Sequence, residues 1–287
     1  MVPVRCRAKD KSKCRIHGIP TKFTSLNMAS QEILDEIQER KVFLINRAQR
    51  IEKIRKLYTV DSFMKPEEYS SAVNDWDYGL RGSAKLFYQA ESRYQHDYLE
   101  QNLSESEFKE VKTALKAMTA NEKHNIVVRN DNALDSFSTF EGYQQHNAII
   151  AATRQAFAVA PTRQFENRLF RGFKFQSEQD YQQWFKNNVT VIDGKPGMRF
   201  KEFVRTSAQP RRAWSFAQDK NYPVLFEVVS KSGLYLDKLA PYTNQEQEVL
   251  FNANTNFTLE NTFETEVKDH DLGGIQRKVR VLQLSAD

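Results

Sequence analysis

Short runs of β-forming residues follow one another through the second half of the chain, starting after Pro161. Gly, Pro and Asn separate the runs, as they separate strands that are joined by turns. The runs read LFRGFKF, VTVI, MRFKEFV, YPVLFEVV, GLYLD, EVLF, FTLENTFE and VRVLQL. Two short helices are predicted between them, SEQDYQQWFKNN with Ser177 as its N-cap and AQPRRAWSFAQ.

The first half of the chain has a helical pattern instead. Residues 66–157 are rich in Glu, Lys, Gln and Ala, and their aromatic residues are spaced for burial. Ser104 and Glu107 form a capping-box pattern that predicts a helix running to about Met118, and the segment NAIIAATRQAF predicts another helix. Helices that precede the strands, rather than alternate with them, predict an α+β fold.

The first 25 residues differ from the rest in charge and in pattern. Seven lysines and arginines against one aspartate give them a net charge of +6, while the whole chain carries +5, so residues 26–287 sum to −1. A basic body would indicate a nucleic-acid partner, but here only this arm carries that indication. We therefore expect a basic flexible arm over 1–25, a helical extension over 26–75 with helical spacing at 30–58, and a main domain over 76–287.

Both cysteines of the chain, Cys6 and Cys14, lie in the arm and precede His17 in the pattern C-x7-C-x2-H. A structural zinc site takes four ligands, and this spacing is not one that zinc fingers use. Two reduced thiols are therefore the simpler interpretation, with metal binding as the alternative.

The sequence carries no membrane or export signal that we recognise. No stretch approaches the roughly 18 consecutive apolar residues that predict a transmembrane helix. The basic N-terminus lacks the apolar core of a signal peptide. We expect a cytoplasmic protein, in the cell that makes it or in a cell that it enters, with no membrane partner.

Three short patterns in the second half are candidates for chemistry: LFRGF at 169–173, FVRTS at 203–207 and EQEVLF at 246–251. Each is common by itself. In the third, Glu246 and Glu248 are two apart, and residues two apart in a strand point to the same face. Two carboxylates on one face repel, which pushes one toward protonation and makes the pair a poor choice for structure alone. An exposed edge strand with a solvated acidic face is the alternative.

In this order, the three patterns resemble the arginine–serine–glutamate class of mono-ADP-ribosyltransferases, which includes enzymatic domains of bacterial binary toxins and several phage enzymes. LFRGF resembles the strand that carries the arginine, FVRTSAQPRRAWSFA the serine motif, and APYTNQEQEVLF the loop with its E-x-E motif. EGYQQHNAIIAATRQ resembles an asparagine-containing helix upstream. The resemblance covers roughly residues 76–287 and implies a helical region followed by a mixed or antiparallel two-sheet core.

The resemblance also implies the substrate and the site. NAD is the expected substrate, with no metal cofactor, and an arginine holds it in place of a glycine-rich phosphate loop. Glu248 is implied to bond a ribose hydroxyl, Arg171 to bind the diphosphate, and Glu246 to act as general base toward the acceptor. The implied catalytic residues are Glu248, Glu246, Arg171 and Ser207; the implied contacts to NAD are Arg171, Gly172, Thr206, Ser207, Phe216 and Glu248; the implied contacts to the acceptor are Tyr242 and Glu246.

Aromatic residues near these motifs have two interpretations. Trp214 and Phe216 follow the Thr-Ser pair at helical spacing and are candidates for the nicotinamide pocket. Burial in the core is the simpler interpretation for both, and likewise for Phe170 and Phe173.

Arg205 departs from the resemblance, because the class has a serine there that helps to orient the catalytic glutamate. Arg205 and Ser207 share a face if the run is a strand, so Ser207 is one candidate for that task. Alternatively, Arg205 pairs with Glu248 and holds it ionised. A loss of activity is the third interpretation.

The expected activity is that of an NAD–protein (arginine) ADP-ribosyltransferase, because the class combines a glutamate at the position of Glu246 with arginine acceptors. The expected partners are target proteins with an exposed arginine, in the setting of a toxin or phage effector that an antitoxin or chaperone restrains. Three alternatives stay open: transfer to RNA with the help of residues 1–25, hydrolysis of NAD, and a degenerate NAD-binding module without activity.

Overall fold

The computed structural model describes residues 38, 42, 62–74, 83–130, 135–162, 166–218, 221–240, 247–269 and 273–286. The chain divides into two compact units, Met1–Lys53 and Ile54–Asp287, and every element named below belongs to the second. The predicted arm and nearly all of the predicted helix over 30–58 lie outside the described residues; Gln38 and Val42 are helical. The predicted domain boundaries therefore stay predictions.

Helices form the first part of the second unit, as predicted. They are α2 (Glu68–Asn74), α3 (Ser83–Asn102), α4 (Glu105–Ala120), α5 (Lys123–Asn130) and α6 (Phe140–Val159). The capping box of α4 is confirmed, because the Ser104 hydroxyl accepts from the N–H of Glu107 and the Glu107 carboxylate accepts from the N–H of Ser104. α6 begins earlier than the predicted segment, at Phe140, where the Thr139 side chain caps it.

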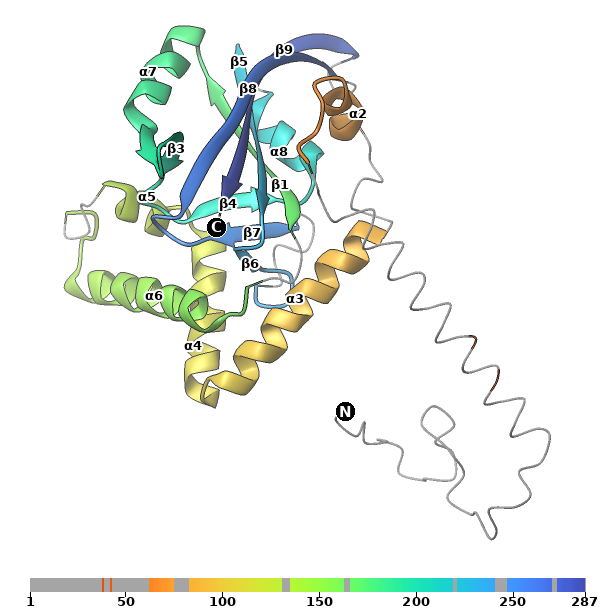
Figure 1. The fold of residues 1–287 in the computed structure, drawn as a ribbon. Helices are drawn as coiled ribbons and strands as arrows, with labels where there is room; N and C mark the ends of the chain where they lie inside the picture. Colours follow the sequence, from red (N-terminus) through yellow and green to blue (C-terminus); the bar gives the residue numbers. More distant parts are fainter. Residues whose placement is uncertain are drawn as a thin grey trace. The chain divides into compact units, whose positions relative to one another are not determined.

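The strands pair into one nine-stranded sheet of order β2-β3-β8-β9-β5-β1-β4-β7-β6 (Figure 1). They are β1 (Asn167–Phe175), β2 (Val189–Ile192), β3 (Lys195–Arg199), β4 (Val204–Ser207), β5 (Tyr222–Ser230), β6 (Leu234–Tyr235), β7 (Glu248–Phe251), β8 (Asn256–Asp269) and β9 (Ile275–Ala286). Neighbouring strands are antiparallel except β5 and β9, which run parallel. The run MRFKEFV is divided between β3 and β4, and residues 200–203 between them are not in a strand.

Two helices interrupt the strands, α7 (Glu178–Asn188) and α8 (Pro210–Ala217). The predicted cap of α7 is confirmed, because the Ser177 hydroxyl accepts from the N–H of Asp180. α8 begins with Pro210, which suits a first helical turn because its missing N–H has no partner there in any helix. A mixed sheet with helices before and between its strands confirms the predicted α+β class.

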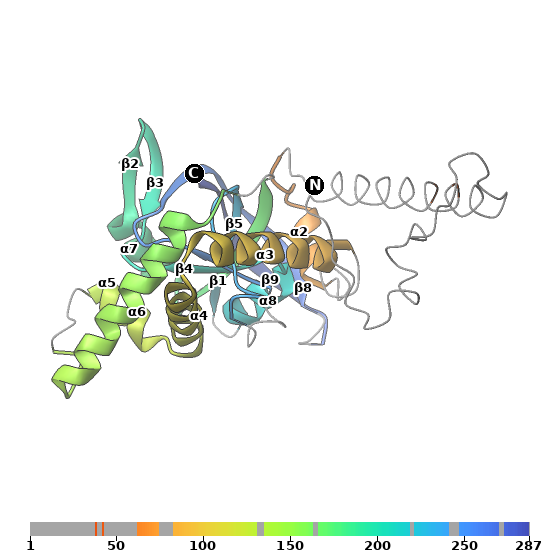
Figure 2. The same cartoon turned by 90° about the horizontal axis from the view of Figure 1, so that it is seen from below.

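The apolar core consists of three clusters. The first joins both halves of the sheet, with Phe226 of β5 and Leu282 of β9 packed in the same cluster as Val249 of β7. The second packs α4 and α6 against β6 and β7, and the third packs α2 and α8 against β1, β5 and β9. Figure 1 shows these two helical groups on different sides of the sheet, and Figure 2 shows α3, α4 and α6 in front of it. The strands that carry the three sequence motifs lie between them.

Among the residues that the structure describes, no helix combines the length and the hydropathy of a membrane span.

Candidate active site

Three strands that are far apart in the sequence, β1, β4 and β7, are neighbours in the sheet. Phe170 of β1 lies opposite Ser207 of β4, and Ser207 in turn lies opposite Glu248 of β7. Side chains opposite each other across an antiparallel pair have Cβ atoms only about 4.5–5.5 Å apart. The register therefore gathers the arginine, serine and glutamate patterns of the sequence, with Arg171 next to Phe170 on β1.

Glu248 is buried, with 2% of its surface exposed, and is held through both its side chain and its backbone. Arg205 donates from Nε to Oε1 at 2.6 Å and from Nη2 to Oε2 at 3.4 Å. The Tyr88 hydroxyl and the N–H of Leu236 donate to the backbone carbonyl of Glu248 at 2.8 and 3.1 Å. The carboxylate therefore has a defined position at the start of β7, against a guanidinium.

The pairing of Arg205 with Glu248, which the second interpretation for this position expects, is present. Its Nη2 also donates to the backbone carbonyl of Thr119 at 3.1 Å, in the last turn of α4. A helix C-terminus carries partial negative charge and favours a cation there. The Ser207 hydroxyl accepts from the N–H of Gln209 at 3.0 Å, just before α8 begins.

Arg171 lies on β1 with its side chain largely buried, 17% exposed. Its Nη2 donates to Glu202 Oε1 at 3.2 Å, and its guanidinium carbon lies 4.6 Å from the ring centre of Phe173. Nη1 is also buried but has no hydrogen-bond partner among the described residues. Burial lowers the pKa of Arg171, while the Glu202 carboxylate acts in the opposite direction. The guanidinium stays charged near neutral pH. Its Nη1 can donate a hydrogen bond to an acceptor atom of a ligand.

Glu202 is a residue of this site that the sequence analysis missed. It is buried, 4% exposed, and its carboxylate lies between Arg171 and Nε of Arg129, which comes from α5. α5 also binds the backbone of Phe203, the residue after Glu202. The Asn125 side chain donates to the carbonyl of Phe203 at 2.7 Å and accepts from its N–H at 2.9 Å. The segment between β3 and β4 is therefore fixed by the helical region, and Glu202 with it.

A cavity of about 810 Å³ opens beside Arg171. Its volume is within the range of roughly 300–1,000 Å³ that is usual for small-molecule sites. The cationic side chains that line it are Arg129, Arg171, Lys174, Arg199 and Lys201, and the aromatic ones are Phe173, Phe175, Trp184 and Phe200. Glu202 is the carboxylate that lines it. Cations and aromatic faces together suit a ligand with phosphate groups and a planar ring. Except for Arg171 and Phe173, the sequence analysis had not singled out these residues.

Gly172 faces away from Arg171, since neighbouring residues of a strand point to opposite faces. A Cβ atom at Gly172 would lie 1.9 Å from the backbone oxygen of Ala213 in α8. This close approach explains glycine at this position by packing, without a contact to a ligand. Thr206 is buried, and its hydroxyl donates to the carbonyl of Val249 at 2.8 Å, which ties β4 to β7.

The aromatic candidates differ in burial. Trp214 and Phe170 are buried in the cluster under α8, so the core interpretation is confirmed for both. Phe173 is partly buried against the first apolar cluster and also lines the cavity beside Arg171. Phe216 is 50% exposed, and the Arg212 guanidinium lies 4.9 Å from its ring centre. The core interpretation is therefore wrong for Phe216, because its side of α8 faces solvent.

Glu246 and Tyr242 lie outside the described residues, so their assigned contacts stay predictions. β7 begins at Glu248, and Gln247 has a φ of 44°, which is not strand geometry. The expectation that Glu246 and Glu248 share a face of one strand is therefore wrong as stated. Cys6, Cys14 and His17 are also outside the described residues.

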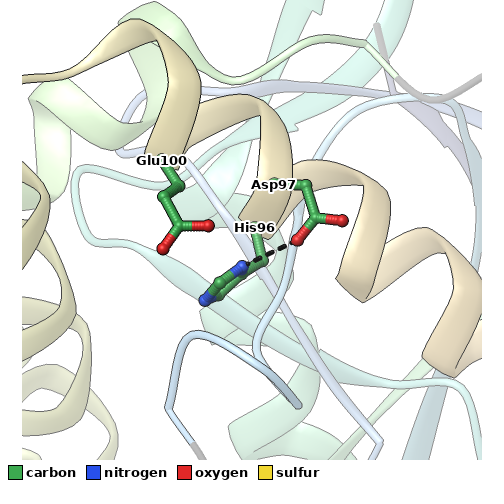
Figure 3. A group of neighbouring side chains, drawn as sticks. All are labelled: His96, Asp97 and Glu100. Atoms are coloured by element: carbon green, nitrogen blue, oxygen red, sulfur yellow. Dashed lines mark hydrogen bonds and ion pairs between the residues drawn. The ribbon is translucent and has the colours of Figure 1, made fainter. Parts of the chain in front are cut away.

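One group of three side chains of metal-ligand type occurs in the described part of the chain: His96, Asp97 and Glu100 of α3 (Figure 3). Their ligand atoms lie within 4.8 Å of one another, and Nδ1 of His96 lies 3.1 Å from an Asp97 oxygen. Asp97 and Glu100 are exposed, and none of the three lines the cavity beside Arg171. Exposed acidic groups of this kind are common without an ion.

Comparisons with known proteins give structural neighbours only. No family model matches the sequence, and no curated protein matches it. The chain is similar to the Vis toxin, an ADP-ribosyltransferase from Vibrio splendidus, at 16% identity over 79% of this chain and 88% of that one, with a TM-score of 0.45. It is also similar to Plx2a, an ADP-ribosyltransferase toxin from Paenibacillus larvae, at 13% identity over 70% and 96% of the two chains, with a TM-score of 0.47. The enzymatic component C2-I of the Clostridium botulinum C2-toxin is 15% identical over 76% of this chain and 49% of its own length, with a TM-score of 0.49.

Proposed function

We propose that this protein is a mono-ADP-ribosyltransferase, which cleaves NAD to nicotinamide and transfers the ADP-ribose to an acceptor. One observation carries the proposal: the neighbouring strands β1, β4 and β7 carry Arg171, Ser207 and Glu248, and a cation-rich cavity opens beside Arg171. These are the residue types, in the same chain order, that mark the class which the sequence resembles. Their assembly from three distant segments is what that class requires of its site.

Glu248 supplies the charge that the reaction needs. Breaking the nicotinamide–ribose bond builds positive charge on the ribose, and nicotinamide leaves as a neutral molecule that needs no acid. A carboxylate fixed beside the ribose stabilises that charge, and more strongly in a buried site than in water. Glu248 is buried and is held by side-chain and backbone hydrogen bonds, which suits this role.

Arg171 binds the diphosphate in this proposal. A planar guanidinium donates two parallel hydrogen bonds to phosphate oxygens. Nη1 of Arg171 is buried without a hydrogen-bond partner among the described residues, so a phosphate oxygen would satisfy it. Lys174 and Lys201 add positive charge at the cavity, and the ring of Trp184 offers a face for a planar base.

The acceptor in this proposal is an arginine side chain of a target protein. A guanidinium must lose a proton before it attacks the ribose, and a carboxylate serves as the general base. Glu246 is the candidate base and Tyr242 a candidate contact to the acceptor. We place the enzyme in the setting of a toxin or phage effector, in which an antitoxin or chaperone protects the producing cell.

The first experiment incubates the purified full chain with NAD labelled in its adenylate and with a host-cell lysate, followed by treatment with RNase or with protease. We expect label that survives RNase and is lost to protease, together with released nicotinamide. Glu248→Gln should abolish both label and nicotinamide, whereas Glu264→Gln, in an exposed ion pair outside the cavity lining, should leave both unchanged.

The other outcomes separate the alternatives. Label lost to RNase would move the acceptor to RNA and give residues 1–25 a role. Nicotinamide release without label would indicate NAD hydrolysis. Intact NAD in every reaction would leave a degenerate binding module and overturn the proposed activity.

A further inference from the structure

We propose that Arg205 is a positioning residue, which holds the Glu248 carboxylate ionised and in one orientation by an ion pair anchored at the end of α4. The inference rests on the proposed function for its catalytic meaning. The geometry on which it stands is independent of that function.

The ion pair is short and two-pronged. Nε of Arg205 lies 2.6 Å from one oxygen of Glu248, and Nη2 lies 3.4 Å from the other. Two donors on one rigid plane fix both the position and the rotation of a carboxylate, which one hydroxyl cannot do. A serine at this position would supply one hydrogen bond and no charge.

Burial makes the charge of Arg205 necessary. The Glu248 side chain is 3% exposed, whereas the Arg205 side chain is 32% exposed. A carboxylate out of water favours its neutral form unless an opposite charge lies close by. A neutral Glu248 would lose the charge that stabilises the developing positive ribose. Arg205 therefore maintains the form of Glu248 that the reaction uses.

Arg205 is itself held in place by the helical region. Its Nη2 donates to the carbonyl of Thr119 at 3.1 Å, at the negative end of α4. The register places Arg205 opposite Leu250 and Ser207 opposite Glu248, so Arg205 reaches Glu248 diagonally across β4 and β7. A long side chain spans this diagonal and reaches α4 as well. The catalytic carboxylate is thereby connected to a helix that lies before the whole sheet in the sequence.

A carboxylate offers about four acceptor positions, and Arg205 uses two of them. The ion pair therefore does not by itself exhaust the capacity of Glu248 to accept from a ribose hydroxyl. This is why we assign Arg205 a positioning role and not a blocking one.

The test compares Arg205→Met, Arg205→Lys and the control Arg280→Met, which removes another arginine–glutamate pair whose residues do not line the cavity. The first readout needs no activity. The full chain is labelled with 13C at glutamate carboxyls, Glu248→Gln assigns the resonance, and its titration is followed by NMR. We expect Glu248 to titrate at clearly higher pH in Arg205→Met, and close to wild type in Arg205→Lys and Arg280→Met.

The second readout is NAD cleavage as a function of pH. In Arg205→Met the acidic limb of kcat should move to higher pH with little change in KM. Where the assay pH lies below that limb, kcat should fall about tenfold for each further pH unit, because the ionised fraction of Glu248 falls by that factor. Arg205→Lys should keep the limb but lower kcat, because one ammonium cannot fix the rotation of the carboxylate. Unchanged titration and an unchanged limb in Arg205→Met would overturn the proposal.

The double variant Arg205→Met/Glu248→Gln, which removes both charges, distinguishes a folding defect of Arg205→Met from the loss of its positioning role. If Arg205→Met unfolds and the double variant folds, the unpaired carboxylate was the cause, as the proposal expects. If both unfold, Arg205→Lys decides: wild-type kcat in that variant overturns the orienting role. A wild-type chain that cleaves no NAD would defeat the proposed function, while the NMR titration would still test the ion pair.

Discussion

The side chain of Asn125 forms two hydrogen bonds with the backbone of Phe203, donating to its carbonyl at 2.7 Å and accepting from its N–H at 2.9 Å. Asn125 lies in α5, and Phe203 lies just before β4. This contact links the helical region to the segment that carries Glu202 and leads to Arg205. The site is therefore built by helices as well as by strands.

We expect Asn125→Ala to destabilise the fold by about 2–4 kcal/mol, because it leaves two buried backbone groups without partners. Asn125→Asp keeps the acceptor for the N–H of Phe203 but places a carboxylate oxygen against its carbonyl, so it should also destabilise the fold. Urea denaturation gives the free energy of unfolding. Asn102→Ala, which removes an exposed side-chain bond to the carbonyl of Tyr98, is the control and should change little. Equal effects of Asn125→Ala and Asn102→Ala would contradict this prediction.

Arg171→Lys should weaken NAD binding about tenfold, equivalent to about 1.4 kcal/mol. A lysine keeps the charge but loses the planar fork that reaches both Glu202 and a phosphate. Calorimetric titration in the Glu248→Gln background measures the dissociation constant without turnover. Arg280→Lys, at an arginine outside the cavity lining, serves as the matched control. An unchanged dissociation constant for Arg171→Lys would remove Arg171 from the binding site.

Glu227 is buried with no exposed surface and gathers four partners, the N–H of Met64, the Tyr69 hydroxyl, Gln283 and Arg168. Burial and the neighbouring carboxylate raise the pKa of Tyr69, so its hydroxyl stays a donor. Glu227→Ala should destabilise the fold by about 3–5 kcal/mol, since it leaves the partly buried Arg168 guanidinium and three other donors without their acceptor. Thermal unfolding measures the loss, and Glu227→Gln should cost less because it keeps acceptor capacity for the surrounding donors. A near-neutral Glu227→Ala would show that water satisfies these groups.

Stability should fall as the pH drops below about 6.5, the ordinary pKa of histidine, in part because of His124 and His146. Their Nδ1 atoms lie 3.0 Å apart, and their rings are stacked at 5.3 Å. Burial lowers both pKa values, and the positive charge of Lys123 adds to the effect. The unfolded chain therefore binds more protons, so this contribution is complete above pH 6.5 and is lost as the pH falls toward the lowered pKa values.

Urea denaturation at pH 7.5 and 5.5 checks the histidine prediction. His146→Gln removes one titrating ring, so the difference between the two pH values should be smaller than in the wild type. His96→Gln, which replaces a histidine of α3 outside this stacked pair, is the control and should keep the full difference. The same pH dependence in all three proteins would assign the loss of stability to other groups.

The sequence by itself determined the local structure around this site. Ser104 and Ser177 cap their helices as predicted, because a cap joins residues only three apart in the chain. β1, β5 and β7 coincide closely with the predicted runs of β-formers. Their β-branched and aromatic residues pack well on the buried surface of a sheet, so composition alone predicts these strands. The order of helices before strands was enough for the α+β class.

Only the tertiary structure decided which of these segments meet. Strand pairing brings Phe170, Ser207 and Glu248 together from distant parts of the chain. A run of β-forming residues does not show which other strand it will pair with, so the sequence could not predict these contacts. The sequence around Glu202 did not indicate its place in the site. That place depends on Arg129 of α5 and Arg171 of β1, which only the tertiary structure brings to its carboxylate. The pairing of Arg205 with Glu248 likewise follows from the diagonal register of β4 and β7 and from the reach of a long side chain to α4.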